Sequence, residues 1–140
     1  MQIASDMLNY CMDKKTAKVG TDLRSHCPVA GVLDIVGDKW TLLVVRDLFL
    51  GKHRYGEFQV APEAIPTNIL AERLKRLEAA GIVKKEYYQD NPPRAEYYLT
   101  RKGAALAPIL RAMREWGLEH IDGTSVPDKY KQFQMPEISD

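Results

Sequence analysis

The sequence predicts an α+β fold that is mainly α-helical, with several helices leading into one β-hairpin and a further helix after it. Three observations predict it. Residues 65–81 repeat leucine at helical spacing and end at a glycine. Residues 82–88 and 95–100 are rich in β-branched and aromatic residues, and a Pro- and Asn-containing turn separates them. Residues 101–121 then return to a helical pattern.

The segment around which the chain is organised is the helix predicted over residues 66–80. Leu70, Leu74 and Leu77 recur at i, i+4 and i+7 and therefore share one face. Pro66 suits the first turn of a helix, where its missing N–H costs little. Gly81 suits the end, because glycine accepts the left-handed cap conformation.

The opposite face of this helix has side chains of the kinds that read base edges. It carries Thr67, Asn68, Ala71, Glu72 and Lys75. Asparagine pairs with adenine, lysine with guanine or phosphate, and glutamate accepts a hydrogen bond from cytosine. The same pattern also fits an ordinary packed helix with a solvated outer face, so the helix alone does not decide between them.

Three helices are predicted before it. A first helix over residues 28–37 begins at a proline and ends at a glycine. Residues 39–50 form the most apolar segment and predict a central, largely buried helix. A short helix over residues 55–61 carries Phe58. Residues 1–26 are expected to be an arm that packs on its own domain or on a partner subunit.

The C-terminal part predicts a dimerisation element. Thr100 can cap a helix over residues 101–121, which Pro108 would kink or restart. This helix follows an already complete three-helix-plus-hairpin unit, so its apolar face is expected to meet a second subunit. Residues 122–140 read as a tail or loose strap. The domains expected are therefore 1–26 (arm), 27–102 (DNA-binding domain) and 103–140 (dimerisation helix and tail).

Composition sets the broad class. The chain has 45% hydrophobic and 28% charged residues and a net charge of +1, as in a soluble globular protein. No apolar run approaches a membrane span, and the N-terminus does not resemble a secretory signal. Two cysteines, Cys11 and Cys27, are too few for a disulfide framework or a cysteine zinc site. We expect a cytoplasmic, reduced protein with no membrane partner.

The order helix, helix, short helix, helix, hairpin is that of a winged helix-turn-helix domain, whose second turn helix docks in the DNA major groove. From residue 71 to 102 there are eight basic and five acidic residues, a mild positive excess compatible with phosphate contact. The alternative is a winged helix that binds a protein partner and no nucleic acid. A third version binds DNA under control of a small hydrophobic effector held between the wing domain and the terminal helices.

The chain resembles the HxlR-type family of winged-helix transcription regulators. The ordered motifs that carry the resemblance are Cys27-Pro28, Gly37 to Thr41, Leu48 to Gly51, Arg54 to Phe58, Ile65 to Gly81, Pro93 to Tyr97, Leu99-Thr100, Gly103, Leu106 and Trp116. The resemblance implies a homodimeric DNA-binding repressor or activator, a recognition helix over 66–80 and a wing over 82–100. The chain departs from the family at Asp38, Tyr55 and Pro66, where glycine, phenylalanine and serine are usual. Pro66 removes a side-chain cap, so the helix start must rely on Thr67 or on backbone geometry.

These inferences predict a DNA-binding surface and an inverted-repeat operator in double-stranded DNA, with half-sites about 10 bp apart. The residues expected to bind DNA are Thr67, Asn68, Ala71, Glu72, Lys75, Arg76, Lys84, Lys85 and Arg94. Of these, Asn68, Glu72 and Lys75 are expected at base edges and Thr67 and Arg76 near phosphate. The wing residues are expected on the DNA backbone.

Cys27 is a candidate redox sensor. It precedes Pro28 at the start of a helix, where the positive end of the dipole favours a thiolate. The resemblance implies the same, because some family members sense oxidants or electrophiles through the matching cysteine. The alternative is a small residue that packs between arm and domain. Cys11 is a conceivable resolving partner, although nothing in the spacing requires it.

No enzymatic activity, metal site or cofactor is expected. The sequence has no phosphate-cradling glycine loop and no paired metal-binding histidines. His26 beside Cys27 does not make a nucleophile–base pair, because sequence neighbours rarely face each other and no third orienting group is evident.

Overall fold

The computed structural model describes residues 23–133. The chain divides into two compact units, Met1–Lys39 and Trp40–Asp140, and each is described by itself. The first unit contributes one described helix, α2 (Pro28–Val36), which begins after Cys27 and ends at Gly37 as predicted. Its Val29 and Leu33 are about half exposed, so their own unit does not bury them. Residues 1–22 of the predicted arm, including Cys11, lie outside the described residues.

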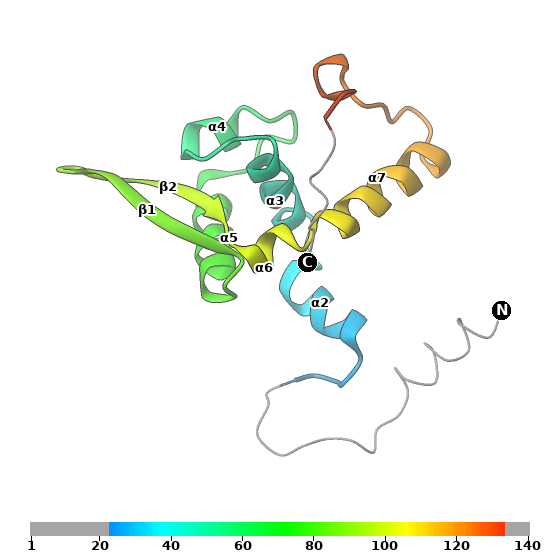
Figure 1. The fold of residues 1–140 in the computed structure, drawn as a ribbon, viewed down its shortest axis with the longest axis horizontal. Helices are drawn as coiled ribbons and strands as arrows, with labels where there is room; N and C mark the ends of the chain where they lie inside the picture. The colour runs from blue at the N-terminus through cyan, green and yellow to red at the C-terminus, as the bar shows by residue number, and fades with distance from the viewer. Residues whose placement is uncertain (1–22, 134–140) are drawn as a thin grey trace. The chain divides into compact units, whose positions relative to one another are not determined.

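The second unit is a winged helix-turn-helix (Figure 1), which confirms the predicted fold class. Its elements are α3 (Thr41–Phe49), α4 (Tyr55–Gln59), α5 (Thr67–Ala79), β1 (Val83–Asp90), β2 (Pro93–Leu99), α6 (Arg101–Ala104), α7 (Ala107–His120) and a 3₁₀ turn at Asp128–Tyr130. Helices α4 and α5 form the helix-turn-helix, and β1 and β2 form the wing. The predicted domain boundaries after residues 26 and 102 stay predictions.

The core of this unit is built where the leucine spacing of α5 predicts it. Leu70, Leu74 and Leu77 are at most 1% exposed and pack with Val45 of α3 and Phe58 of α4. The end of α5 is also as expected. Ala80 caps the helix, Gly81 has a φ of +74°, and the amide of Ile82 donates to the carbonyl of Leu77. This cap turns the chain directly from α5 into the wing.

The wing is a two-stranded antiparallel sheet held to the helix-turn-helix by one backbone hydrogen bond and one side-chain contact to the backbone. The amide of Tyr97 donates to the carbonyl of His53 at 2.9 Å, just before α4, and His53 Nδ1 lies 2.8 Å from the Tyr97 carbonyl oxygen. The strands run further toward the tip than predicted, because Gln89 pairs with Arg94 and Asp90 with Pro93. Pairing across the hairpin outweighs the weak strand propensity of these residues.

A short helix joins the wing to the last helix. The Thr100 hydroxyl accepts a hydrogen bond from the amide of Gly103, which confirms the predicted cap. The helix predicted over 101–121 restarts after Ala105, with Pro108 in the first turn of α7. Gly103 packs very closely on the wing, since a Cβ atom there would lie 2.1 Å from the carbonyl oxygen of Ile82. No helix within residues 23–133 is long and apolar enough to cross a bilayer.

Candidate nucleic-acid interface

The outer face of α5 is open to solvent. Every residue predicted on it is exposed: Thr67, Asn68, Ala71, Glu72, Lys75 and Arg76. Within the described part of the chain, the side chains of Asn68 and Lys75 make no hydrogen bond or ion pair. Two groups that can read base edges are therefore free to meet a ligand.

Thr67 connects the two helices of the helix-turn-helix. Pro66 occupies the N-cap of α5 and makes no side-chain cap hydrogen bond. The Thr67 hydroxyl accepts a hydrogen bond of 2.7 Å from Gln59 at the end of α4. The side chain thus fixes the spacing of α4 and α5 and stands at the first turn of α5, where helix N–H groups attract phosphate.

Glu72 is paired within its own helix. Its carboxylate forms an ion pair with Arg73 and lies 3.8 Å from Nε of Arg76, one turn later. These exposed pairs are weak individually and would exchange readily for contacts with DNA. Glu72 and Arg76, predicted to contact base and phosphate respectively, are therefore neighbours on the same exposed face.

An ion-pair network holds the segment between α4 and α5. Arg46 on α3 donates to both carboxylate oxygens of Glu63, which lies in that segment, and also to Asp47 at 3.0 Å. The bonds from Arg46 hold the pKa of Glu63 below its ordinary value. Asp47 is only 4% exposed and is also 3.5 Å from the ammonium of Lys52. Arg46 and Asp47 thus form an ion pair on α3 in which the carboxylate is almost fully buried.

The three cations predicted to bind DNA from the wing differ in whether another side chain already contacts them. Lys84 is exposed but pairs with Glu86 at 3.0 Å. Lys85 is exposed and lies 4.9 Å from the ring centre of Tyr87. Arg94, next to the hairpin tip, is exposed and makes no ion pair among the described residues. Arg94 is thus the wing cation with the least competition for a phosphate.

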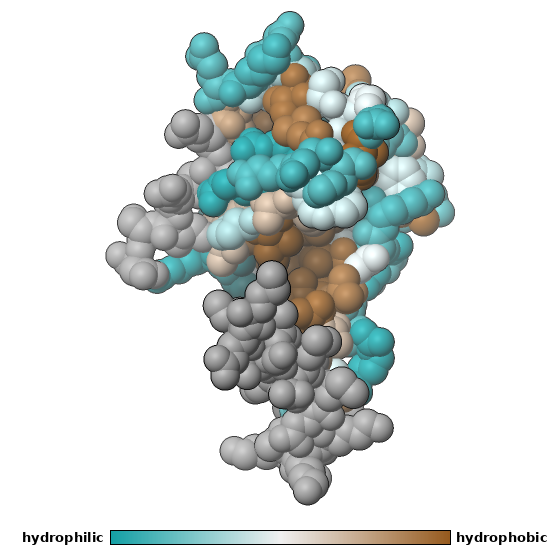
Figure 2. All heavy atoms as spheres, turned by 90° about the vertical axis from the view of Figure 1, so that its right-hand side faces the viewer, coloured by the Kyte–Doolittle hydropathy of each residue, from teal (hydrophilic) through white to brown (hydrophobic). Residues whose placement is uncertain are grey.

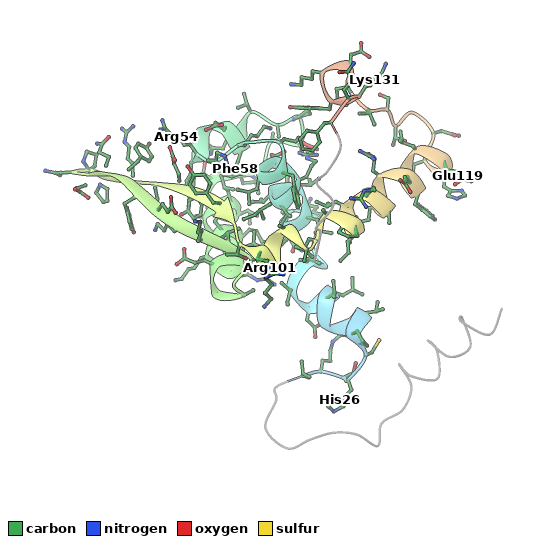
Figure 3. All side chains as sticks on the ribbon, viewed as in Figure 1. His26, Arg54, Phe58, Arg101, Glu119 and Lys131 are labelled. Atoms are coloured by element: carbon green, nitrogen blue, oxygen red, sulfur yellow. The ribbon has the colours of Figure 1, made fainter. Side chains whose placement is uncertain are left out.

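Sequence reasoning missed Arg54 as a site residue. This arginine immediately precedes α4 (Figure 3). Its guanidinium donates to Glu96 on β2 at 2.7 and 2.9 Å and stacks 4.1 Å above the ring centre of Tyr88. Hydrogen bonds from Tyr98 and Arg54 hold the pKa of Glu96 below its ordinary value. Arg54 is the first residue of the family motif Arg54 to Phe58, but that motif does not indicate that the side chain lies against the wing. Only the contacts with Glu96 and Tyr88 show this.

Arg54 belongs to a concave surface between the start of α4 and the wing. The hollow has a volume of about 710 Å³, and Lys85 and Arg94 also line it. Burial raises the pKa of Tyr97, on its inner wall, to about 12, so this phenol stays neutral. The hollow holds three cations against one carboxylate, Glu57, so its excess of positive charge suits an anionic partner such as a nucleic-acid backbone.

Cys27 lies in the other unit. It is a half-buried thiol at the N-cap of α2, and its backbone amide donates to the Ser25 hydroxyl at 3.2 Å. Its predicted position at a helix start is confirmed, and its reactivity stays a prediction. Among residues 23–133 no group of three or more His, Cys, Asp or Glu side chains is arranged to hold a metal ion.

Comparison with known proteins identifies the family. The family described as HxlR-like helix-turn-helix matches residues 35–125, which is more than half of the chain. This chain belongs to the HxlR-like family. The match includes the helix-turn-helix, the whole wing and α7, so the resemblance predicted from the sequence is confirmed.

Relatives of this HxlR-like chain are transcriptional regulators. It is 38% identical over 99 residues to the HTH-type transcriptional regulator sll1512 of Synechocystis sp., covering 71% of this chain and 73% of that protein. It is 42% identical over 90 residues to the HTH-type regulator YvaP of Bacillus subtilis, covering 64% and 83%. The structure of the redox regulator HypR in its oxidized form superposes with a TM-score of 0.62 at 41% identity, covering 69% of this chain and 99% of that one.

Proposed function

We propose that this HxlR-like protein is a homodimeric, cytoplasmic transcription regulator that reads an inverted repeat in double-stranded DNA. The observation that carries the proposal is the outer face of α5. It lies on the second helix of a helix-turn-helix, its residues are exposed, and Asn68 and Lys75 on it are unpaired among the described residues. A helix in this position enters the major groove.

In this proposal each surface has its own role. Asn68, Glu72 and Lys75 contact base edges, with Ala71 packed against them at the groove floor, while Thr67 and Arg76 contact phosphate. Lys84, Lys85 and Arg94 contact the DNA backbone beside the major groove. Arg54 joins this set through the hollow that it shares with Lys85 and Arg94.

The dimer is proposed to form through α7. Ile109, Met113 and Trp116 recur at i, i+4 and i+7 and are 36%, 53% and 60% exposed. Figure 2 views the side of the molecule that carries α7 and shows hydrophobic residues at the surface there. An apolar stripe of this kind is typical of a helix covered by a second subunit. Two copies related by a two-fold axis would place two α5 helices in successive major grooves, about 10 bp apart.

The test is selection from random duplex DNA by the full-length, reduced protein. Enrichment of an inverted repeat is expected, with binding that weakens steeply as salt rises. A folded dimer that enriches no sequence would contradict the proposal and favour the alternative, a winged helix that binds a protein partner with little salt dependence.

The redox response is proposed to reside in Cys27, because the thiol stands at the N-cap of α2. Oxidation or alkylation there is expected to change the affinity of the dimer for its selected DNA. The Cys27→Ser protein should bind the same DNA and lose the response to diamide. A Cys27→Ser protein that responds like the wild type would remove Cys27 from the proposal.

A further inference from the structure

A second hollow lies between α3, α7 and the segment that follows α7, beside the proposed dimer stripe and away from α5 and the wing. It has a volume of about 470 Å³. Its walls are Leu43 and Leu50 of the α3 segment, Leu110 and Leu118 of α7, and Val126 and Phe133 of the segment that follows α7. That segment folds back at Thr124, whose hydroxyl lies 2.9 Å from the carbonyl oxygen of Gly117.

The charged residues that line this pocket within residues 23–133 all have one sign. Among them are Arg46 and Arg114 and no aspartate or glutamate, and the rest of the described wall is mostly apolar. Arg46 is engaged by Asp47 and Glu63. Arg114 is half-buried and makes no ion pair or hydrogen bond among the described residues. The pocket therefore presents one uncommitted guanidinium beside an apolar wall.

We propose that this pocket binds a small organic anion with an apolar body, whose carboxylate pairs with Arg114. A cation that is partly removed from water without a counterion is unfavourable, and a carboxylate relieves this through two parallel hydrogen bonds. The volume falls within the range of about 300–1,000 Å³ found for small-molecule sites. The apolar wall accounts for the rest of the ligand.

The pocket differs from the face of α7 assigned to the dimer. The proposed dimer stripe runs through Ile109 and Trp116, whereas the pocket uses Leu110, Arg114 and Gly117, about 100° further around the helix. Met113 stands at the border between the two and belongs to both. A convex helix stripe suits a second copy of the chain. A hollow closed on one side by Val126 and Phe133 suits a small molecule, because a second helix would have to displace that segment.

Arg46 connects the pocket to the recognition helix. The same guanidinium that lines the pocket holds Glu63 in the segment before α5. A bound carboxylate that draws Arg46 toward itself weakens this hold and changes the entry of the chain into α5. This regulatory link rests on the proposed DNA binding, whereas the binding site itself does not.

The experiment compares two probes of the same shape, 2-naphthoate and the neutral 2-naphthamide, by calorimetric titration of the full-length protein without DNA. One saturable site for 2-naphthoate is expected, with 2-naphthamide bound about tenfold more weakly, as befits one charge-assisted pair. Arg114→Gln should reduce 2-naphthoate binding to the level of the amide. Arg111→Gln, on the same helix but outside the pocket, is the matched control and should leave both affinities unchanged.

A second variant tests the location of the site. A Cβ at Gly117 meets no heavy atom within 4 Å, so Gly117→Leu adds a side chain at the pocket wall without a backbone clash. It should abolish binding of both probes, whereas Gly117→Ala should retain it. Equal binding of acid and amide, no binding of either at millimolar concentration, or binding unaffected by Arg114→Gln would overturn the proposal. The proposal would also be overturned if the Gly117→Leu protein bound 2-naphthoate like the wild type, whether or not it still dimerised.

The regulatory link has a separate readout. Once the preferred DNA sequence has been selected, 2-naphthoate should weaken the affinity of the wild-type protein for that DNA several-fold. It should weaken the affinity of the Glu63→Gln protein by a smaller factor. If the protein binds 2-naphthoate and its affinity for DNA does not change, the link to α5 is overturned. The binding site itself is then still supported by the titration. Failure of DNA selection would instead contradict the proposed function, since the titration needs no DNA.

Discussion

Helices α5 and α7 have nearly the same length and the opposite kind of surface. Both bury an inner face, α5 through three leucines and α7 through Ala107 and Leu110. The outer face of α5 carries polar and charged side chains, whereas that of α7 carries Met113 and Trp116. The difference indicates two kinds of partner, because exposed polar groups suit hydrated nucleic acid and exposed apolar groups suit protein.

The inner face of α5 should tolerate change least. Leu74 is 1% exposed in the middle of the core, so Leu74→Ala leaves a cavity and is expected to lower the free energy of unfolding by about 2–5 kcal/mol. Urea unfolding followed by circular dichroism measures it. Ala71→Ser, on the outer face one turn earlier, is the control and should change stability by less than about 0.5 kcal/mol.

The outer face of α7 should matter for association and little for folding. Trp116→Glu places a charge in the proposed dimer interface and is expected to weaken dimerisation by at least about 2 kcal/mol, or roughly thirtyfold. Sedimentation equilibrium checks it. Val60→Glu is the matched control, because Val60 is 78% exposed and lies outside α7. A Trp116→Glu protein that dimerises like the wild type would remove the contrast between the two helices.

The outer face of α5 should decide sequence preference. Asn68→Ala is expected to cost about 1–3 kcal/mol of binding and to relax the preference at one base position of the selected site. Repeating the selection with the variant protein shows which position has relaxed. A uniform loss across all sequences would reassign Asn68 from a base edge to a phosphate.

The wing should contribute affinity without preference. Arg94→Ala is expected to weaken binding to all sequences alike and to reduce the slope of log affinity against log salt by about one. Fluorescence anisotropy over a salt series measures both quantities. Arg54→Gln should behave in the same way if the hollow follows the DNA backbone, and an unchanged slope in both variants would remove the hollow from the interface.

The features that the sequence predicts correctly are those set by local chemistry. The leucine period of α5, the left-handed turn at Gly81 and the cap at Thr100 each need only residues that are close in the chain. The exposed positions on α5 follow from the same period. The helix restart near Pro108 follows from the missing amide of proline.

The features that it does not predict depend on contacts between distant residues. Arg54 meets Glu96 across 42 positions, and Arg46 meets Glu63 across 17. The second hollow needs residues 121–133, whose composition reads as a tail, to fold back against α7 and α3. No periodicity in that segment indicates this return, because it depends on the positive φ of Gly123 and on the Thr124 hydroxyl, which lies within hydrogen-bond distance of the carbonyl oxygens of Gly117 and Ile121.

The contact between Gly103 and Ile82 has a mechanical consequence. Because no side chain fits between α6 and the base of the wing, we expect the two to move as one rigid body, so that the hairpin turns whenever α6 turns. An eight-residue strand is roughly 26 Å long, so tilting α6 by about 5° moves the tip of the hairpin by roughly 2 Å. Arg94 stands near that tip. A small reorientation of the last helix is thereby amplified into a displacement comparable with the length of a hydrogen bond.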